Sequence, residues 1–107
     1  MPQSKKTRRE TLEEFLAAKP NDAFARYGLA LECANSGDTG AAMEHFRQLL
    51  VVHPDYVAGY FHYGHLLARL QRPEEARQIL STGISVARRV GDQHAGSEME
   101  AALDALG

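Results

Sequence analysis

The chain has few features that would set it apart from ordinary soluble proteins. It has one cysteine, Cys33, which excludes an internal disulfide and suits a reducing compartment. No apolar run approaches the roughly 20 residues of a membrane-spanning helix. Twelve lysines and arginines stand against fourteen aspartates and glutamates, so no strong field draws the chain to nucleic acid or to an anionic membrane. We expect a cytoplasmic protein whose partners include neither nucleic acid nor membrane.

Motifs for catalysis and for cofactor binding are also missing. The sequence has no Gly-x-Ser-x-Gly motif, no phosphate-binding glycine loop and no His-Glu-x-x-His run. His62 and His65 stand three residues apart, but two ligands without a third make a weak metal site. The acids Glu74 and Glu75 fall in a first helical turn, where the helix dipole favours them without any chemical role. We expect no enzyme activity, no metal and no cofactor.

The chain does contain helical patterns separated by short turn signals. Apolar residues recur every three or four positions, and no segment alternates as a strand would. Thr7 and Glu10 have the spacing of a capping box, and Pro20 ends that first helix near residue 18. The later helices are expected to start at a cap on Asn21 or Asp22, on Asp38 and on Asp55, at Pro73 in a first turn, and after a break at Gly91-Asp92. The fold class is all-α.

Size and polarity repeat along the chain with a period of 34 residues. Residues 23–56 laid over 57–90 pair Leu29 with Tyr63, Ala30 with Gly64, and Ala42 with Ala76. A fixed period near this length indicates stacked helix pairs, each too small to bury its own apolar face alone. The small residues at these positions have the bulk required where two helices cross closely.

In these residues the chain resembles the tetratricopeptide repeat family. That family places a large, a small and another large residue along the first helix of each repeat, then a small Ala in the second helix and often a closing Pro. Here the first repeat offers Leu29-Ala30, Cys33, Gly37-Asp38, Ala42, Phe46 and Pro54, and the second offers Tyr60, Tyr63-Gly64, Leu67, Ala76, Leu80 and Gly83. The chain departs from the pattern at Arg26, at Gln71-Arg72 and at Arg88. Arg88 replaces the closing Pro, which predicts a fifth helix that continues to Val90.

The resemblance implies an all-α, antiparallel helix-pair solenoid, with about two and a half tetratricopeptide repeats plus a C-terminal capping helix, in a single domain over 1–107. Its parts would be a flexible tail at 1–6, a half repeat at 7–20, repeats at 23–56 and 57–90, and the capping helix at 93–106. Glu98 falls where a third repeat needs a small residue, so the last helix is expected to cover the open end. The basic run at 5–9 lacks interleaved aromatics, and we expect it to be solvated.

The family uses the first helix of each repeat to line a concave groove that receives partner peptides or helices. Carried onto this chain, the groove candidates are Phe24, Tyr27, Leu31, Asn35, Phe61, His65 and Arg69. They lie on a second stripe, away from Leu29, Ala30 and Cys33. Accessible aromatic residues favour binding because they bury a large area and have few rotors to freeze. The resemblance therefore implies a protein–protein interaction module, used as an adaptor or scaffold.

The character of the groove predicts the kind of partner. Tyr27 and Leu31 stand where some family members place the Lys and Asn that clamp chaperone tails, so we expect a hydrophobic helix or extended segment instead. Arg69 would add one anionic contact. Two alternatives remain open: the same aromatic stripe could form a homodimer interface, or the first or last helix could fold over the stripe and close the core.

Overall fold

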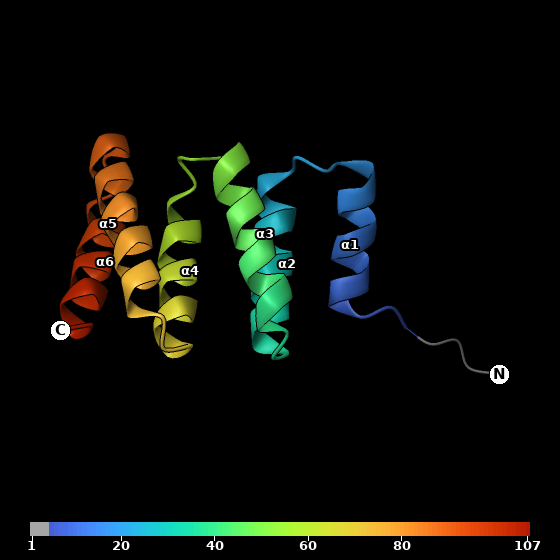
Figure 1. Cartoon of the computed structure of the whole chain (residues 1–107). Helices are drawn as coiled ribbons and strands as arrows, with labels where there is room; N and C mark the ends of the chain where they lie inside the picture. The colour runs from blue at the N-terminus through green and yellow to red at the C-terminus, as the bar shows by residue number, and fades with distance from the viewer. Residues whose placement is uncertain (1–4) are drawn as a thin grey trace. The chain divides into compact units, whose positions relative to one another are not determined.

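The computed structural model describes residues 5–107, which fold into six α-helices and no strand (Figure 1). The expected tail at 1–6 lies largely outside the described residues, because nothing is described before residue 5. The all-α expectation is confirmed. The helices are α1 (Arg8–Ala18), α2 (Ala23–Asn35), α3 (Thr39–Val52), α4 (Val57–Arg69), α5 (Pro73–Val90) and α6 (Gln93–Ala105).

Most helix starts follow the capping signals. Glu10 donates its amide to Thr7 Oγ1 (3.1 Å), and Thr7 donates its amide to Glu10 Oε1 (2.9 Å), which completes the capping box. Asp22, Asp38 and Asp92 each accept a hydrogen bond from the amide three residues further on. Local sequence therefore determines where α1, α2, α3 and α6 begin.

The expected cap at Asp55 is wrong. The fourth helix begins at Val57, and the residue before it, Tyr56, makes no side-chain capping bond. The Tyr56 amide donates to the His53 carbonyl (3.0 Å), and this turn delays the start of α4. The Asp55 carboxylate instead accepts a hydrogen bond from Arg89 of α5.

The described chain forms two compact units, an N-terminal unit that ends at residue 49 and a C-terminal unit over residues 50–107. In the N-terminal unit α1 packs against α2, and Leu29, Phe46 and Leu49 are almost completely buried. Cys33 is also fully buried, and burial raises the pKa of its thiol. The stripe that the sequence assigned to the core of α2 therefore lies inside, as expected.

The C-terminal unit contains the last turn of α3 and the helices α4, α5 and α6. The fifth helix lies beside both α4 and α6 (Figure 1) and packs against each of them. The sixth helix also contacts α4. The core cluster of buried side chains is Tyr60, Leu80, Ile84, Val86, Ala87 and Met99. As expected, α5 runs on to Val90 before Gly91 ends it with a left-handed φ of 80°.

Two large apolar residues that continue the helical spacing of three and four lie at the surface. Phe15 of α1 is 44% exposed, and the Lys19 ammonium lies 6.0 Å from the centre of its ring. Val90 is 48% exposed. It is the last residue of α5 and lies beyond Ala87, the last buried residue of that helix. The periodic spacing of apolar residues can continue to the end of a helix even where no neighbouring element covers that end.

The helix crossings in the C-terminal unit depend on two glycines. A Cβ added to Gly64 would lie 2.5 Å from Leu80 Cδ2, and one added to Gly83 would lie 2.5 Å from both Tyr60 Cβ and Met99 Sδ. Non-bonded carbon atoms normally stay about 3.5–4.0 Å apart. The helices therefore approach this closely only because both residues lack a side chain.

We predict that Gly83→Ala lowers the free energy of unfolding by about 1–3 kcal/mol. The Tyr60 Cβ is bonded directly to the backbone, so no rotamer change can move it away from the new methyl group. Urea unfolding followed by circular dichroism measures the change. Gly40→Ala is the matched control, because nothing lies within 4 Å of its added Cβ. Its stability should be unchanged or slightly raised, and an equal loss in both variants would contradict the tight crossing.

Candidate functional site

The second helix presents two different stripes. Ala25, Leu29, Ala30 and Cys33 are buried, whereas the predicted positions Phe24, Tyr27, Leu31 and Asn35 are all at least partly exposed. Phe24 is 73% exposed. The first helix approaches α2 at Gly28, where Leu12 would lie 3.6 Å from an added Cβ, and it leaves Phe24 uncovered. The stripe on α2 is thus an accessible aromatic and aliphatic surface.

The fourth helix also presents a second stripe, although one member is partly used by the core. His65 and Arg69 are exposed, while Phe61 is half-buried and packs against the core cluster. The Phe61 ring meets His65 edge-on, with 4.7 Å between ring centroids, and meets His62 in the same way at 5.1 Å. Phe61 therefore offers a fixed, partly accessible ring that also contributes to the packing of the C-terminal unit.

The charge of Arg69 is not neutralised by any residue in the described part of the chain. Within residues 5–107 every other arginine forms an ion pair or hydrogen bond with another residue, and Arg69 forms none. The helix that carries it, α4, contains no aspartate or glutamate. An exposed guanidinium in this state can accept a carboxylate from another molecule without breaking an existing bond.

Arg26, which departs from the family pattern, has a structural role in the N-terminal unit. Its guanidinium lies 3.0 Å from His45 Nδ1 of α3 and donates to the Pro20 carbonyl at 3.0 Å. One side chain thereby ties α2 to α3 and to the turn after α1. Burial lowers the pKa of His45, and the nearby charge of Arg26 lowers it further.

The histidines of α4 are not arranged as metal ligands. No group of three or more His, Cys, Asp or Glu residues that could hold a metal ion occurs in the described part of the chain. Burial lowers the pKa of His62, and the adjacent His65 contributes in the same direction. The imidazole rings of His62 and His65 next to the Phe61 ring add polar edges to an otherwise apolar surface.

The basic run near the N-terminus is largely paired with acids of its own unit. Lys6 binds Glu14 (2.7 Å), Arg8 binds Glu32 (3.2 Å), and Arg9 binds both Glu13 (3.3 Å) and Asp38 (3.0 Å). The bond from Arg9 lowers the pKa of the Asp38 carboxyl. These cations are consequently not displayed as a continuous positive strip.

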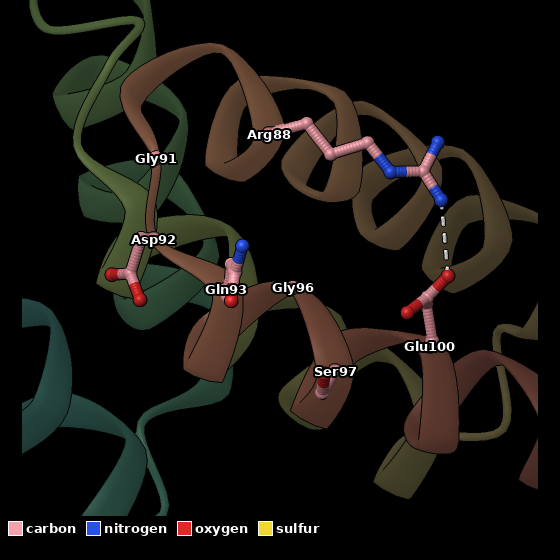
Figure 2. A pocket seen from close by; sticks show the side chains of 7 residues that line it. All are labelled: Arg88, Gly91, Asp92, Gln93, Gly96, Ser97 and Glu100. Carbon is pink, nitrogen blue, oxygen red and sulfur yellow. Dashed lines mark hydrogen bonds and ion pairs between the residues drawn. The ribbon is translucent and has the colours of Figure 1, made fainter.

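A hollow that no sequence pattern predicts lies at the turn between α5 and α6. It has a volume of about 380 Å³ and is lined by Arg88, Gly91, Asp92, Gln93, Gly96, Ser97 and Glu100. Figure 2 shows the ion pair between Arg88 and Glu100, which joins the two helices at 3.0 Å. Asp92 is also engaged, because it caps α6. The charged groups of the hollow are therefore already paired.

Three exposed valines were also not among the predicted site residues. Val51 is 81% exposed, Val52 47% and Val90 48%. A signal for Val51 existed in the sequence, because it falls off the buried stripe of α3 formed by Phe46 and Leu49. Apolar residues at a helix end do not by themselves indicate whether another element covers them.

Comparison with known proteins places the repeat pattern in a family. A family model described as tetratricopeptide repeat matches residues 35–96, which is more than half of the chain. The chain belongs to the tetratricopeptide repeat family. Proteins of this family are in general non-enzymatic modules for protein–protein interaction. No curated protein matches the sequence.

Solved structures agree with this assignment to the tetratricopeptide repeat family. A solution structure of a tetratricopeptide repeat domain protein from Salinibacter ruber is 38% identical, with a TM-score of 0.77 over 81% of this chain and 88% of that one. A crystal structure of such a protein from the same organism is also 38% identical, with a TM-score of 0.75 over 79% and 96% of the two chains. A Bordetella parapertussis protein is 27% identical, with a TM-score of 0.82 over 95% and 89%. Within the described residues, no helix of this repeat protein has the length and apolar character needed to cross a membrane.

The lowered pKa values of His45 and His62 predict that stability falls in mild acid. The folded protein takes up these protons less readily than the unfolded chain. The contribution of these two histidines to the free energy of unfolding is therefore fully present above the ordinary imidazole pKa of about 6.5. It is lost as the pH falls below that value. Thermal melts should show a lower midpoint at about pH 5.5 than at about pH 7.5, a window in which carboxylates remain ionised. A double variant, His45→Gln with His62→Gln, should flatten this dependence, and an unchanged slope would contradict the assignment.

Proposed function

We propose that this chain is an adaptor that binds apolar parts of a partner protein through two accessible stripes, one on α2 of the N-terminal unit and one on α4 of the C-terminal unit. The observation that carries the proposal is the contrast between the two stripes on each helix. The core-facing positions are buried, and the seven proposed contact residues are all at least partly exposed. These residues are Phe24, Tyr27, Leu31 and Asn35 on α2, and Phe61, His65 and Arg69 on α4.

The stripe on α2 would supply most of the affinity. Phe24, Tyr27 and Leu31 expose apolar surface at spacings of three and four residues, which suits a helix or extended segment laid along them. Burial of such surface is favourable by roughly 25 cal/mol per Å². Asn35, at the end of α2, would hydrogen-bond the partner's backbone and fix its position along the stripe.

The stripe on α4 would supply orientation. The Phe61 ring is already held against its neighbours, so little rotamer freedom is lost when a partner covers it. His65 offers a polar ring edge beside it. Arg69 offers a cation with no competing partner in the described chain, which favours a segment that carries one carboxylate next to its apolar residues.

In this proposal the helix at 93–106 caps the array. Met99 points into the core and is completely buried. His94 and Glu98 are exposed, and His94 Nε2 lies 3.2 Å from Glu98 Oε1. A polar exposed face would suit a helix after which no further repeat is stacked. A cytoplasmic setting, suggested by the single cysteine, remains part of the proposal.

The test compares variants in a pull-down from lysate, read by mass spectrometry. Phe24→Ala with Tyr27→Ala should remove a partner that the wild-type protein retains, because each is a candidate anchor whose loss commonly costs about 2 kcal/mol or more. Helicity should be unchanged, since neither side chain is buried. Arg69→Gln should weaken the same partner and reduce the dependence of its binding on salt.

The matched control is Gln48→Ala with Gln78→Ala, two exposed positions on α3 and α5 outside the stripes. This control should retain the partner. If the stripe variant and the control retain it equally, the stripes are not the binding surface. If wild type recovers only its own chain, and this is lost in the stripe variant, the stripe serves self-association and the adaptor proposal is wrong.

A further inference from the structure

The side chain of Arg26 joins three segments of the N-terminal unit. It starts from α2, and its guanidinium reaches His45 Nδ1 on α3 and the Pro20 carbonyl in the turn after α1, at 3.0 Å in each case. Both Arg26 and His45 are half-buried. Their sequence neighbours Ala25 and Phe46 are buried, so the Arg26–His45 contact lies at the margin of the core.

The contact with Arg26 requires one protonation state of His45. A guanidinium stays charged in proteins, and it has five N–H donors but no acceptor. Nδ1 of His45 must therefore accept the hydrogen bond, which requires a neutral imidazole with its proton on Nε2. A proton added to Nδ1 removes the acceptor and leaves two cations facing each other at 3.0 Å. The Arg26–His45 bond and a protonated His45 thus exclude each other.

The other charged groups near His45 do not offset the repulsion from Arg26. One further arginine and three acids act on the imidazole, from α1, from the turn before α3 and from α3 itself: Arg9, Glu13, Asp38 and Glu44. Each of these acids already binds a cation. Arg9 binds Glu13 at 3.3 Å and Asp38 at 3.0 Å, and Arg47 lies 3.7 Å from Glu44. Burial and the two arginines lower the pKa of His45 by more than the acids raise it.

We propose that Arg26 and His45 form a proton-sensitive latch that fastens α2 to α3 and opens in mild acid. With His45 neutral, Arg26 holds α3 and the turn after α1 together. When His45 takes up a proton from solvent, its hydrogen bond with Arg26 is lost and the two helices separate more often. The folded state binds this proton less readily than the unfolded chain does, so the latch is closed above the ordinary imidazole pKa of about 6.5 and opens as the pH falls below it.

The latch makes the acid response of the N-terminal unit depend on Arg26, which burial of His45 alone would not. It also has a consequence for the accessible stripe of α2. Arg26 lies between Phe24 and Tyr27 on that helix, so opening of the latch loosens the helix that displays both aromatic residues. This consequence rests on the proposed function, whereas the latch itself does not.

The first test is an NMR titration of the histidine rings in the wild-type protein and in Arg26→Gln. The His45 midpoint should lie below about 6.5 in the wild-type protein and should rise in the variant, because the facing positive charge is gone. The matched internal control is His62, a half-buried histidine of the C-terminal unit, whose midpoint should be the same in both proteins. A His45 midpoint that does not change with Arg26→Gln overturns the latch.

The second test leaves Arg26 unchanged and measures opening directly. Amide hydrogen exchange of α2 is recorded at about pH 7.5 and about pH 5.5, and each rate is divided by the intrinsic rate at that pH. Protection in the wild-type protein should fall about five- to tenfold, because uptake of one proton one pH unit below 6.5 changes the opening equilibrium by at most about tenfold.

Two variants decide whether this fall in protection belongs to the latch. His45→Gln keeps an amide oxygen that can accept from Arg26 at either pH, so its protection should be nearly the same at both. His62→Gln is the matched control and should show the wild-type fall. Protection that is independent of pH in the wild-type protein overturns the proposal. So does a fall that persists in His45→Gln or disappears in His62→Gln.

Discussion

The close approach of α5 to its two neighbours is the constraint on which the C-terminal unit depends. At Gly64 and Gly83 a β-carbon would overlap atoms of the facing helix. Such crossings fix the rotation of α4 about its own axis, because only the face that carries Gly64 fits against α5. With that face turned inwards, His65 and Arg69 must point outwards. The accessible stripe of α4 is therefore a consequence of how its opposite face packs.

Much of the fold was predictable because its signals are local. A capping side chain bonds the amide three residues later, and a helical stripe shows as apolar residues spaced by three and four. Neither signal requires knowledge of a distant residue. Local signals fail at Asp55, because its carboxylate accepts a hydrogen bond from Arg89, which is 34 residues away in the sequence. The partial burial of Phe61 and the exposure of Val51 have the same origin. The exposure of each side chain depends on which helix packs beside it, and the sequence pattern does not predict that neighbour.

The ion pairs of this protein act mainly by removing charge from its surface. Exposed pairs such as Arg8 with Glu32 contribute about 0–1 kcal/mol each to stability. Their larger effect is to leave a surface on which few charges remain available to a partner. Against that background the unpaired Arg69 and the apolar residues Phe24 and Val51 are the distinctive groups. In the proposed function, recognition depends on such side chains, which have no partner among the described residues.

The buried thiol of Cys33 can be used to measure local unfolding of the N-terminal unit. A thiol reacts as the thiolate, and this sulfur is both shielded from solvent and raised in pKa by burial. Alkylating reagents can reach it only when α2 separates from the helices around it. Because no other cysteine competes, the rate of labelling measures how often the N-terminal unit opens under native conditions. Alkylation at this one site therefore gives the rate of local unfolding without any added label.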